Sequence, residues 1–190
     1  MTRDELLEAS ALIFSQKGFH GTSMQDIAQA VNLQKASLYH HVSSKQEILL
    51  GVLDKALDLL IERMQGVIEL RLPPDQKLRQ AICTYLVSLI EHRDLASVLL
   101  LEHRSLEAQY SLQHTPRRDR FEHMWRDLVV EGQNLGAFES QDPDLAARAL
   151  LGVMNWTITW YNPDGVLSVE EISYQYADLF LQGLLPRTMH

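Results

Sequence analysis

The chain has 190 residues, of which 46% are hydrophobic, so it is long and apolar enough to bury a core. Its apolar runs are too short to cross a bilayer, its first residues do not resemble a signal peptide, and its single cysteine, Cys83, excludes an intrachain disulfide. These features predict a cytoplasmic protein.

The formal net charge of −8 at pH 7 is unevenly distributed. Residues 1–45 carry four basic and four acidic side chains, whereas the remainder carries 13 basic and 21 acidic ones. The acidity therefore belongs to the part after residue 45. If the first part binds nucleic acid, it must contact phosphates through a few placed groups rather than through a strongly basic surface.

The first predicted element is an amphipathic helix over residues 3–17. Its apolar side chains recur at helical spacing, and the pair Lys17-Gly18 is typical of a helix end. A lone helix of this length is only marginally stable in water. We therefore expect it to pack on the next segment of the chain and to form a small three-helix core.

Residues 22–45, TSMQDIAQAVNLQKASLYHHVSSK, have the pattern of two short helices joined by a tight turn. Thr22 and Gln25 have capping-box spacing, which predicts that Thr22 caps the first helix. Asn32 tolerates the left-handed conformation that a sharp turn requires, and the second helix is expected from Gln34. Two helices around such a turn, with hydrogen-bonding side chains near the start of the second, form the motif that enters the DNA major groove.

This stretch resembles the TetR family of bacterial repressors, whose pattern is roughly T-[TS]-[MV]-x-x-I-A-x-x-[AV]-G-V-[ST]-x-[GP]-[ST]-L-Y-x-[HY]-F-x-[SN]-K. The residues that match the pattern are Thr22, Ser23, Met24, Ile27, Ala28, Val31, Ser37, Leu38, Tyr39, His41, Ser44 and Lys45. Four positions depart from it: Asn32, Gln34, Ala36 and Val42. Gln34 and Ala36 touch the reading surface, so operator preference is expected to differ from that of relatives.

For contacts with base edges we predict Gln34, Lys35 and Ser37. Lysine pairs with guanine acceptors, and glutamine pairs with adenine. The matching family positions imply phosphate contacts for a second set: Thr22, Tyr39, His40 and Lys45. The alternative is a generic three-helix module whose polar residues only face water.

A long helix is predicted to begin at Ser44, because Glu47 follows at capping-box spacing, and to continue to about Leu72, before Pro73-Pro74. No flexible linker separates the DNA-binding part from the rest of the chain. A helix that starts at the DNA and ends deep in the second domain is suited to act as a lever.

The rest of the chain also has helical periodicity, without a strand pattern or an internal repeat. Helices are predicted over residues 75–93, 94–105, 115 to about 132 or 136, 142–161 and from Ser168 onward. The third of these is predicted to start at Thr115-Pro116, because proline is common at the first helical position. Residues 106–114 are expected to contain a loop.

The helix over residues 142–161 is apolar on two sides. One stripe comprises Leu145, Ala149, Val153, Trp156 and Trp160, and the other comprises Ala147, Leu151, Met154, Ile158 and Tyr161. Such a helix must be buried on both sides. The resemblance implies that it joins the last helix in a four-helix homodimer interface. Such a dimer would place its two helix-turn-helix modules roughly 34 Å apart on a palindromic operator.

The resemblance also implies that the C-terminal part binds a small molecule. The candidate ligand-binding residues are Tyr85, His103, Arg104, Phe121, Met124, Trp125, Asn155, Trp156, Trp160 and Tyr161. The segment NWTITWYNPDGVLSVEEI resembles a signature of regulators whose ligands are acyl-CoA thioesters. Arginines that could meet coenzyme A phosphates are Arg104, Arg117, Arg118, Arg120 and Arg148. The aromatic residues could equally belong to the core, and the arginines could form a solvated face.

An enzyme is not predicted, because the chain has no phosphate-binding glycine loop, no H-E-x-x-H and no nucleophile elbow. Asp119, His123 and Asp127 recur at four-residue steps on one helix face. That spacing fits a divalent metal edge, but it is more often a solvated stripe. We therefore predict no catalytic residue, no metal and no cofactor.

Together these patterns predict an all-α homodimeric repressor, with a three-helix helix-turn-helix module over residues 1–45 and a helical ligand-binding and dimerisation domain over residues 46–190. An effector, with an acyl-CoA thioester as the candidate, would release the operator by population shift. Two alternatives remain. One is a repressor of an efflux or detoxification operon induced by a hydrophobic drug-like ligand. The other is a ligand-independent DNA-binding architectural factor.

Overall fold

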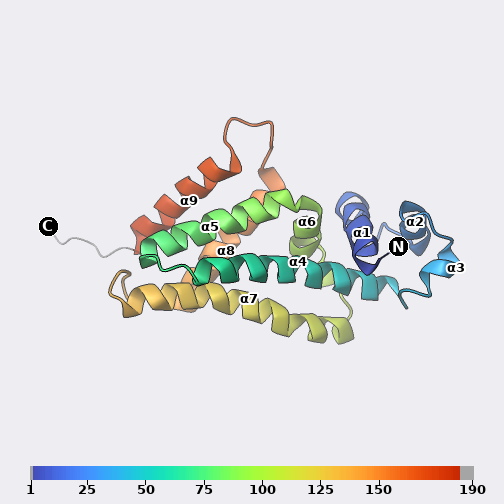
Figure 1. Cartoon of the computed structure of the whole chain (residues 1–190), viewed down its shortest axis with the longest axis horizontal. Coiled ribbons are helices and arrows are strands. Elements are labelled where there is room, and N and C mark those ends of the chain that lie inside the picture. The colour runs from blue at the N-terminus through green and yellow to red at the C-terminus, as the bar shows by residue number, and fades with distance from the viewer. Residues whose placement is uncertain (1, 185–190) are drawn as a thin grey trace. The chain divides into compact units, whose positions relative to one another are not determined.

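The computed structural model describes residues 2–184, and all the regular structure in that range is helical (Figure 1). The elements are α1 (Arg3–Lys17), α2 (Met24–Ala30), α3 (Lys35–Leu38), α4 (Lys45–Ile68), α5 (Pro74–Glu91), α6 (Arg93–Leu101), the short 3-10 helix η1 (His103–Ser105), α7 (Ala108–Asn134), α8 (Pro143–Trp160) and α9 (Val169–Leu184). The predicted all-α fold is confirmed. None of the helices over residues 2–184 is long and apolar enough to span a membrane.

The chain forms two compact units, each built from two chain segments. Within the described range, unit 1 contains the residues up to Leu59 together with His92–Arg118. Unit 2 contains Leu60–Glu91 and the residues from Asp119 onward. Helices α4 and α7 contribute residues to both units. These units reflect packing rather than sequence motifs, so the predicted domain boundary at residue 45 stays a functional prediction. Met1 and residues 185–190 of the predicted domains lie outside the described range.

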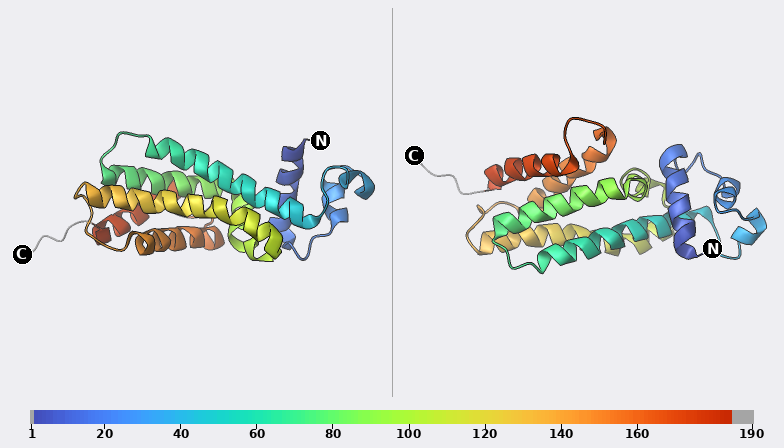
Figure 2. Two further views of the ribbon diagram at one scale, coloured as in Figure 1. Left: turned by 90° about the horizontal axis from the view of Figure 1, so that it is seen from below. Right: turned by 45° about the horizontal axis from the view of Figure 1, so that its top comes forward.

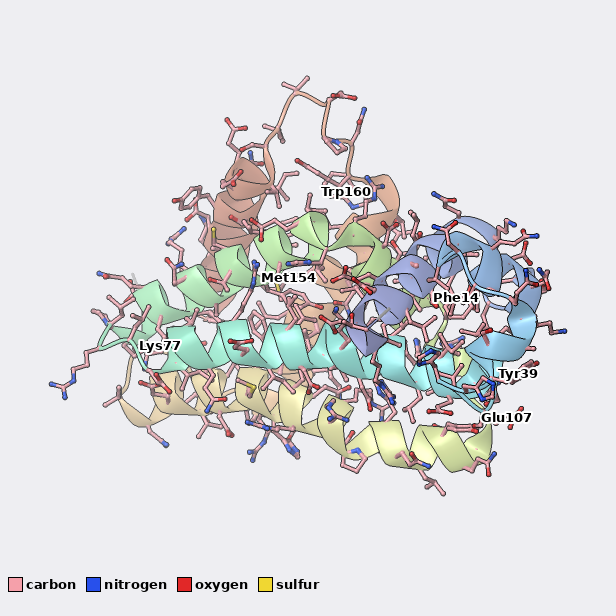
Figure 3. All side chains as sticks on the ribbon, turned by 45° about the vertical axis from the view of Figure 1, so that its right-hand side comes forward. Phe14, Tyr39, Lys77, Glu107, Met154 and Trp160 are labelled. Carbon is pink, nitrogen blue, oxygen red and sulfur yellow. The ribbon has the colours of Figure 1, made fainter. Side chains whose placement is uncertain are left out.

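Helix α1 is the centre of unit 1. It packs against α2, as predicted, and also against α6, which comes from a distant part of the sequence. Its inner face buries Leu6, Ala11 and Phe14, the last of which is labelled in Figure 3. The hydroxyl of Ser15 donates to the Asp94 carboxylate at the start of α6, over 2.6 Å. The helices that support the helix-turn-helix, α1 and α6, therefore come from two separate segments of the chain.

Helix α4 begins as predicted and ends earlier than predicted. The backbone N–H of Glu47 donates to the Ser44 hydroxyl over 3.1 Å, which confirms the Ser44 cap. The Glu47 carboxylate accepts from the backbone and the hydroxyl of Ser43 instead of closing the box on Ser44. The helix stops at Ile68 rather than near Leu72. Leu72 directly precedes Pro73, and a residue before proline is disfavoured in the helical region, so the chain leaves the helix before it reaches Leu72.

The predicted start of a helix at Thr115-Pro116 is wrong. Helix α7 already begins at Ala108 and continues to Asn134, so the expected loop over residues 106–114 is largely helical and Pro116 lies inside the helix. A proline there has no N–H for the carbonyl four residues earlier, which belongs to Leu112. The Leu112 side chain is 76% exposed, so this part of the helix faces water. Water can satisfy a carbonyl on such a face, which makes the interior proline tolerable.

In unit 2, α9 packs along α5, as the right-hand view in Figure 2 shows, and α5 also contacts α8. The carboxylate of Asp142 accepts from the backbone N–H groups of Asp144 and Leu145, which confirms the predicted start of α8. Ser168 and Glu171 form a capping box at the predicted start of α9. The sequence signals for these two helix starts were therefore sufficient.

The two apolar stripes predicted on α8 differ in their surroundings. The stripe from Ala147 to Tyr161 is buried within the chain, and its members Leu151, Met154 and Ile158 are at most 9% exposed. The other stripe lies on the surface, where Trp156 is 66% exposed. Figure 3 labels one residue of each stripe, Met154 and Trp160. One side of α8 therefore fills the core of unit 2, and the other is left without a partner within the described chain.

Candidate DNA-reading and effector sites

Helix α2 is capped by Ser23, so the prediction of Thr22 as its cap is wrong. The backbone N–H of Asp26 donates to the Ser23 hydroxyl over 3.1 Å, and the backbone N–H of Ser23 donates to the Asp26 carboxylate over 2.8 Å. The pairs Thr22–Gln25 and Ser23–Asp26 have the same spacing, but a carboxylate accepts the stronger, charge-assisted hydrogen bond. Lys17 donates to the same carboxylate over 2.8 Å.

The hydrogen bonds from Lys17 and Ser23 hold the pKa of the Asp26 carboxyl well below its ordinary value. The ionised carboxylate therefore joins the end of α1 to the start of α2. Thr22 is buried beside this pair, and its hydroxyl donates to the carbonyl of Gly18 over 2.8 Å. The predicted phosphate contact of Thr22 is untested. In this structure its side chain stabilises the turn between α1 and α2.

The turn between α2 and α3 has the predicted geometry. Asn32 adopts φ 54°, which confirms the left-handed conformation that the sequence led us to expect. Gln34 is the N-cap residue of α3 but makes no side-chain cap hydrogen bond, so its amide is not used by the helix. Leu38 is completely buried and anchors the single turn of α3.

The polar residues around α3 differ in accessibility. Gln34, Lys35, Tyr39 and His40 are exposed, whereas Ser37 is half-buried. Tyr39 is labelled in Figure 3. Four of the residues predicted to contact DNA therefore lie together on the surface of one short stretch. Their division between bases and phosphates stays a prediction.

Lys45, which we predicted to contact phosphate, is bound to the protein itself. Its ammonium donates to the carbonyls of Phe19 and Thr22 over 2.7 and 2.6 Å and lies 4.3 Å from the centre of the Phe19 ring. Burial lowers its pKa. These bonds connect the first turn of α4 to the turn between α1 and α2. They therefore fix the start of α4 relative to the helix-turn-helix.

Gln46 makes a second link from the start of α4. Its side-chain amide donates to the carbonyl of Ser105 over 2.9 Å, and its carbonyl accepts from the backbone N–H of Glu107 over 3.1 Å. The hydroxyls of Ser44 and Tyr110 lie 3.2 Å apart beside this pair. The segment between η1 and α7 is therefore joined to the helix that comes after the reader. Sequence patterns contained no signal for these contacts, because the partners lie about 60 positions apart.

Arg117, one of the arginines suggested for coenzyme A phosphates, is paired within unit 1. Its guanidinium contacts Asp54 over 2.8 Å and Asp58 over 2.7 Å. The Nδ1 atom of the buried His114 lies 2.8 Å from the same Asp54 carboxylate. The charge of Arg117 is thus already compensated by α4.

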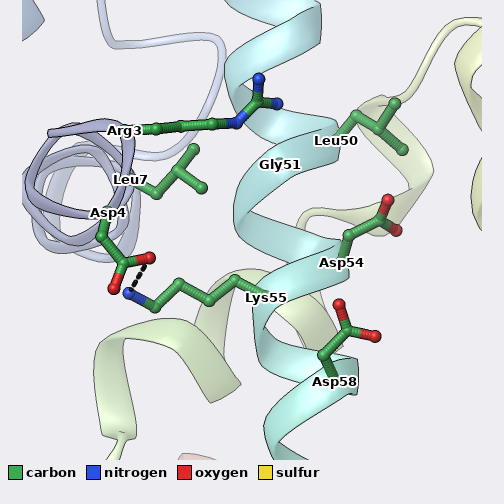
Figure 4. Close-up of a pocket in the computed structure, with 8 residues that line it drawn as sticks. All are labelled: Arg3, Asp4, Leu7, Leu50, Gly51, Asp54, Lys55 and Asp58. Carbon is green, nitrogen blue, oxygen red and sulfur yellow. Dashed lines mark ion pairs between the residues drawn. The ribbon is translucent and has the colours of Figure 1, made fainter.

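A groove lies between α1 and α4 in unit 1, and Figure 4 shows it in close-up. It is lined by Arg3, Asp4, Leu7, Leu50, Gly51, Asp54, Lys55 and Asp58. Lys55 donates to Asp4 over 2.9 Å and to Glu8 over 3.0 Å. A Cβ atom on Gly51 would lie 2.8 Å from a Leu7 methyl group, so the absence of a side chain at this position allows α1 and α4 to approach closely. Among the charged groups of this groove, Lys55 pairs with Asp4, whereas Asp54 and Asp58 pair with Arg117.

An aromatic cluster, formed by Tyr85, Phe121 and Trp125, lies in the core of unit 2. The ring centroids are 5.5 Å apart for Tyr85 and Trp125, with an interplanar angle of 75°, and 5.6 Å apart for Tyr85 and Phe121. All three side chains are buried. The Tyr85 hydroxyl donates to the side-chain carbonyl of Asn155 over 2.5 Å, and burial raises the Tyr85 pKa, so the phenol stays neutral. The structure thus brings together four of the predicted ligand-binding residues.

The other predicted ligand-binding residues are dispersed. Met124 is half-buried on α7, and Tyr161 is buried at the end of α8. Trp156 and Trp160 lie on the exposed stripe of α8. His103 and Arg104 lie in η1, which belongs to unit 1, where burial and then the Arg104 charge lower the His103 pKa. The ligand contacts of these residues stay predictions.

No cluster of three or more histidine, cysteine, aspartate or glutamate side chains that could hold a metal ion occurs over residues 2–184. The aligned Asp119, His123 and Asp127 are therefore not assembled with further ligands in that part of the chain.

A helix-turn-helix with exposed polar side chains around its second helix, in an all-helical chain, defines the class of DNA-binding regulators. Residues 6–52 match the family model described as bacterial regulatory proteins, tetR family. Residues 71–184 match the model described as tetracyclin repressor-like, C-terminal domain. The chain belongs to the tetR family and is a DNA-binding transcriptional repressor rather than an enzyme.

Similar proteins match over nearly the whole chain. The HTH-type transcriptional repressor KstR2 of Mycolicibacterium smegmatis is 31% identical over 96% of this chain and 90% of its own length. The TetR family regulator PfmR of Thermus thermophilus is 36% identical, with a TM-score of 0.87 over 94% of this chain and 98% of PfmR. AibR, in a complex with isovaleryl coenzyme A and operator DNA, is 26% identical, with a TM-score of 0.85 over 98% of this chain and 99% of AibR.

Proposed function

We propose that this repressor binds a palindromic operator as a homodimer and leaves it when an acyl-CoA thioester binds unit 2. The observation that carries the effector class is the full-length similarity to AibR, which has been seen with isovaleryl coenzyme A and operator DNA together. The aromatic cluster supports it, because its buried rings provide apolar surroundings suited to an acyl group. Both the operator and the effector would be met in the cytoplasm.

For the reader, we propose that Gln34, Lys35 and Ser37 contact base edges and that Tyr39 and His40 contact phosphates. The exposure of Gln34, Lys35, Tyr39 and His40 supports this assignment. Lysine and glutamine supply the donors that guanine and adenine acceptors require. Because residues 1–45 have no net charge, operator affinity depends more on where these groups lie than on overall electrostatic attraction to DNA.

For the dimer, we propose that the exposed stripe of α8 packs against its copy in a second chain, together with α9. Trp156 and Trp160 are the largest apolar side chains of that stripe, and Leu179 is exposed on α9. A contiguous apolar face of this kind is normally covered by a partner. Two-fold symmetry would then match the two readers to two operator half-sites.

For release, we propose that α4 transmits the effect of the ligand. Helix α4 is continuous from Lys45 to Ile68 and contributes residues to both units. In its first turn, Lys45 binds the turn between α1 and α2, and Gln46 binds the segment between η1 and α7. An effector that favours a different position of α4 would therefore shift the population toward chains whose two readers no longer fit the operator.

The test is a thermal-shift screen against acetyl-, isovaleryl-, hexanoyl- and palmitoyl-CoA, followed by operator binding at saturating ligand. The operator is first located by footprinting the DNA upstream of the gene. We expect one or more thioesters to raise the melting temperature and to weaken operator binding. Unchanged operator affinity at saturating thioester would contradict the proposal. A drug-like inducer is the second candidate, and it predicts stabilisation by planar hydrophobic compounds but not by thioesters.

A further inference from the structure

The indole N–H of Trp125 has no hydrogen-bond partner among the described residues, although the side chain is completely buried. Buried donors in native proteins are nearly always paired, because a buried N–H without an acceptor loses its hydrogen bonds to water and gains nothing in return. An indole nitrogen can only donate. The position is therefore suited to an acceptor atom that residues 2–184 do not place there.

The neighbours of Trp125 define what kind of acceptor would fit. The rings of Tyr85 and Phe121 lie 5.5 and 6.5 Å from the Trp125 ring, both near perpendicular to it. The neutral Tyr85 hydroxyl donates its proton to the side-chain carbonyl of Asn155. The amide NH₂ of Asn155 is left as a second donor. The cluster thus offers hydrogen-bond donors among apolar rings.

The charge of the cluster restricts the acceptor further. The four side chains that form it, Tyr85, Phe121, Trp125 and Asn155, include no cation. A carboxylate buried among them would lose its hydration without gaining an opposite charge, which is costly. A neutral carbonyl oxygen would accept the indole hydrogen bond without that cost. An apolar chain attached to the carbonyl would pack against the rings.

We infer that the Trp125 indole N–H donates a hydrogen bond to the thioester carbonyl oxygen of the effector, so that this residue distinguishes a thioester from the free acid. The inference rests on the proposed acyl-CoA effector. It assigns the acyl end of the ligand to the aromatic cluster and gives Trp125 a polar role in addition to its role in packing.

The direct measurement is the indole N–H resonance of Trp125 in protein labelled with ¹⁵N-tryptophan. The probes are the thioester from the panel that gives the largest thermal shift, its thioether analogue, in which a CH₂ group replaces the carbonyl, and free coenzyme A. The resonance is assigned from Trp125→Phe. If that variant does not fold, it is assigned by elimination with Trp156→Phe and Trp160→Phe. We expect a downfield shift with the thioester and none with free coenzyme A.

Affinity provides a second readout. Trp125→Phe keeps an aromatic ring and removes the donor, so it should bind the thioester roughly tenfold more weakly and the thioether with nearly wild-type affinity. If the thioester binds and releases the operator but leaves the Trp125 resonance unmoved, the inference is wrong and the proposed function stands. The same conclusion holds if the thioether moves the resonance equally, because the thioether has no carbonyl oxygen to accept the hydrogen bond. If no thioester of the panel binds, both this inference and the proposed effector class are wrong.

Discussion

At the scale of single residues, two ionic side chains hold the helix-turn-helix together. Asp26 joins the start of α2 to Lys17 at the end of α1. Lys45 closes the other side by binding two carbonyls of the turn between those helices. The module is small, so the fixed relation between α1, α2 and α4 depends strongly on these few bonds.

The Asp26 bonds predict an acid-sensitive module. Because the folded-state pKa of Asp26 lies below its ordinary value of 3.8, the carboxylate stabilises the fold above that pH and this contribution is lost as the pH falls. We expect Asp26→Asn to lower the urea midpoint by a constant amount from pH 7 to about pH 4. Below that pH the difference from wild type should shrink. A difference that stays constant down to the acid limit of the titration would contradict the assignment.

The proposed base contact of Lys35 predicts that its removal lowers operator affinity. We expect Lys35→Ala to weaken binding by about 1–3 kcal/mol and to relax preference at one base pair, measured by fluorescence anisotropy on wild-type and substituted operators. The control is Arg71→Ala, which removes one exposed positive charge outside the helix-turn-helix. Equal losses in both variants would show that Lys35 contributes only general charge.

Local spacing predicted some of these residue contacts and could not predict others. The left-handed Asn32 and the cap at Ser44 follow from short-range patterns and are confirmed. The choice of Ser23 over Thr22 depends on the stronger acceptor at Asp26, a feature that the sequence does contain. The contacts of Lys45 and Gln46 depend on tertiary packing, and the missing partner of Trp125 becomes visible only when every neighbour is placed.

At the scale of elements, α7 shows where tertiary packing overrides a local signal. Thr115-Pro116 has the form of a helix start, yet the helix passes through it without a break. His114 and Arg117, on either side of the proline, both bind α4 through Asp54. These contacts favour a continuous helix and offset the cost of the proline. In α8, by contrast, the apolar periodicity and the local cap agree, and the prediction was correct.

The interior proline of α7 predicts a stabilising substitution. Pro116→Ala restores an N–H for the carbonyl of Leu112, so the free energy of unfolding should rise by about 1–2 kcal/mol. This gain is smaller than the full helix preference of alanine over proline, because proline also restricts the unfolded chain. Urea denaturation measures the change. Pro143→Ala is the matched control, because a proline at the start of α8 costs little, and we expect no gain there. Equal gains in the two variants would contradict this account.

At the scale of the whole molecule, the proposed dimer interface on the exposed stripe of α8 can be tested by substitution. We expect Trp156→Glu to convert the dimer to a monomer in sedimentation velocity and to weaken operator binding sharply, because the charge would be buried in an apolar interface. Leu135→Glu is the control, since Leu135 is 67% exposed at the end of α7 and Trp156 is 66% exposed. A Trp156→Glu variant that stays dimeric would place the interface elsewhere.

The interleaving of the two units determines how this repressor can be rebuilt. Unit 1 takes α6 and the start of α7 from beyond residue 91, so a fragment that ends after α4 would lack α6, one of the helices that α1 packs against. A chimera with a new operator preference should therefore exchange residues 92–118 along with the first 59. Because α1 packs against α6 from the second segment, an exchange confined to the first 59 residues would place a new α1 against the original α6.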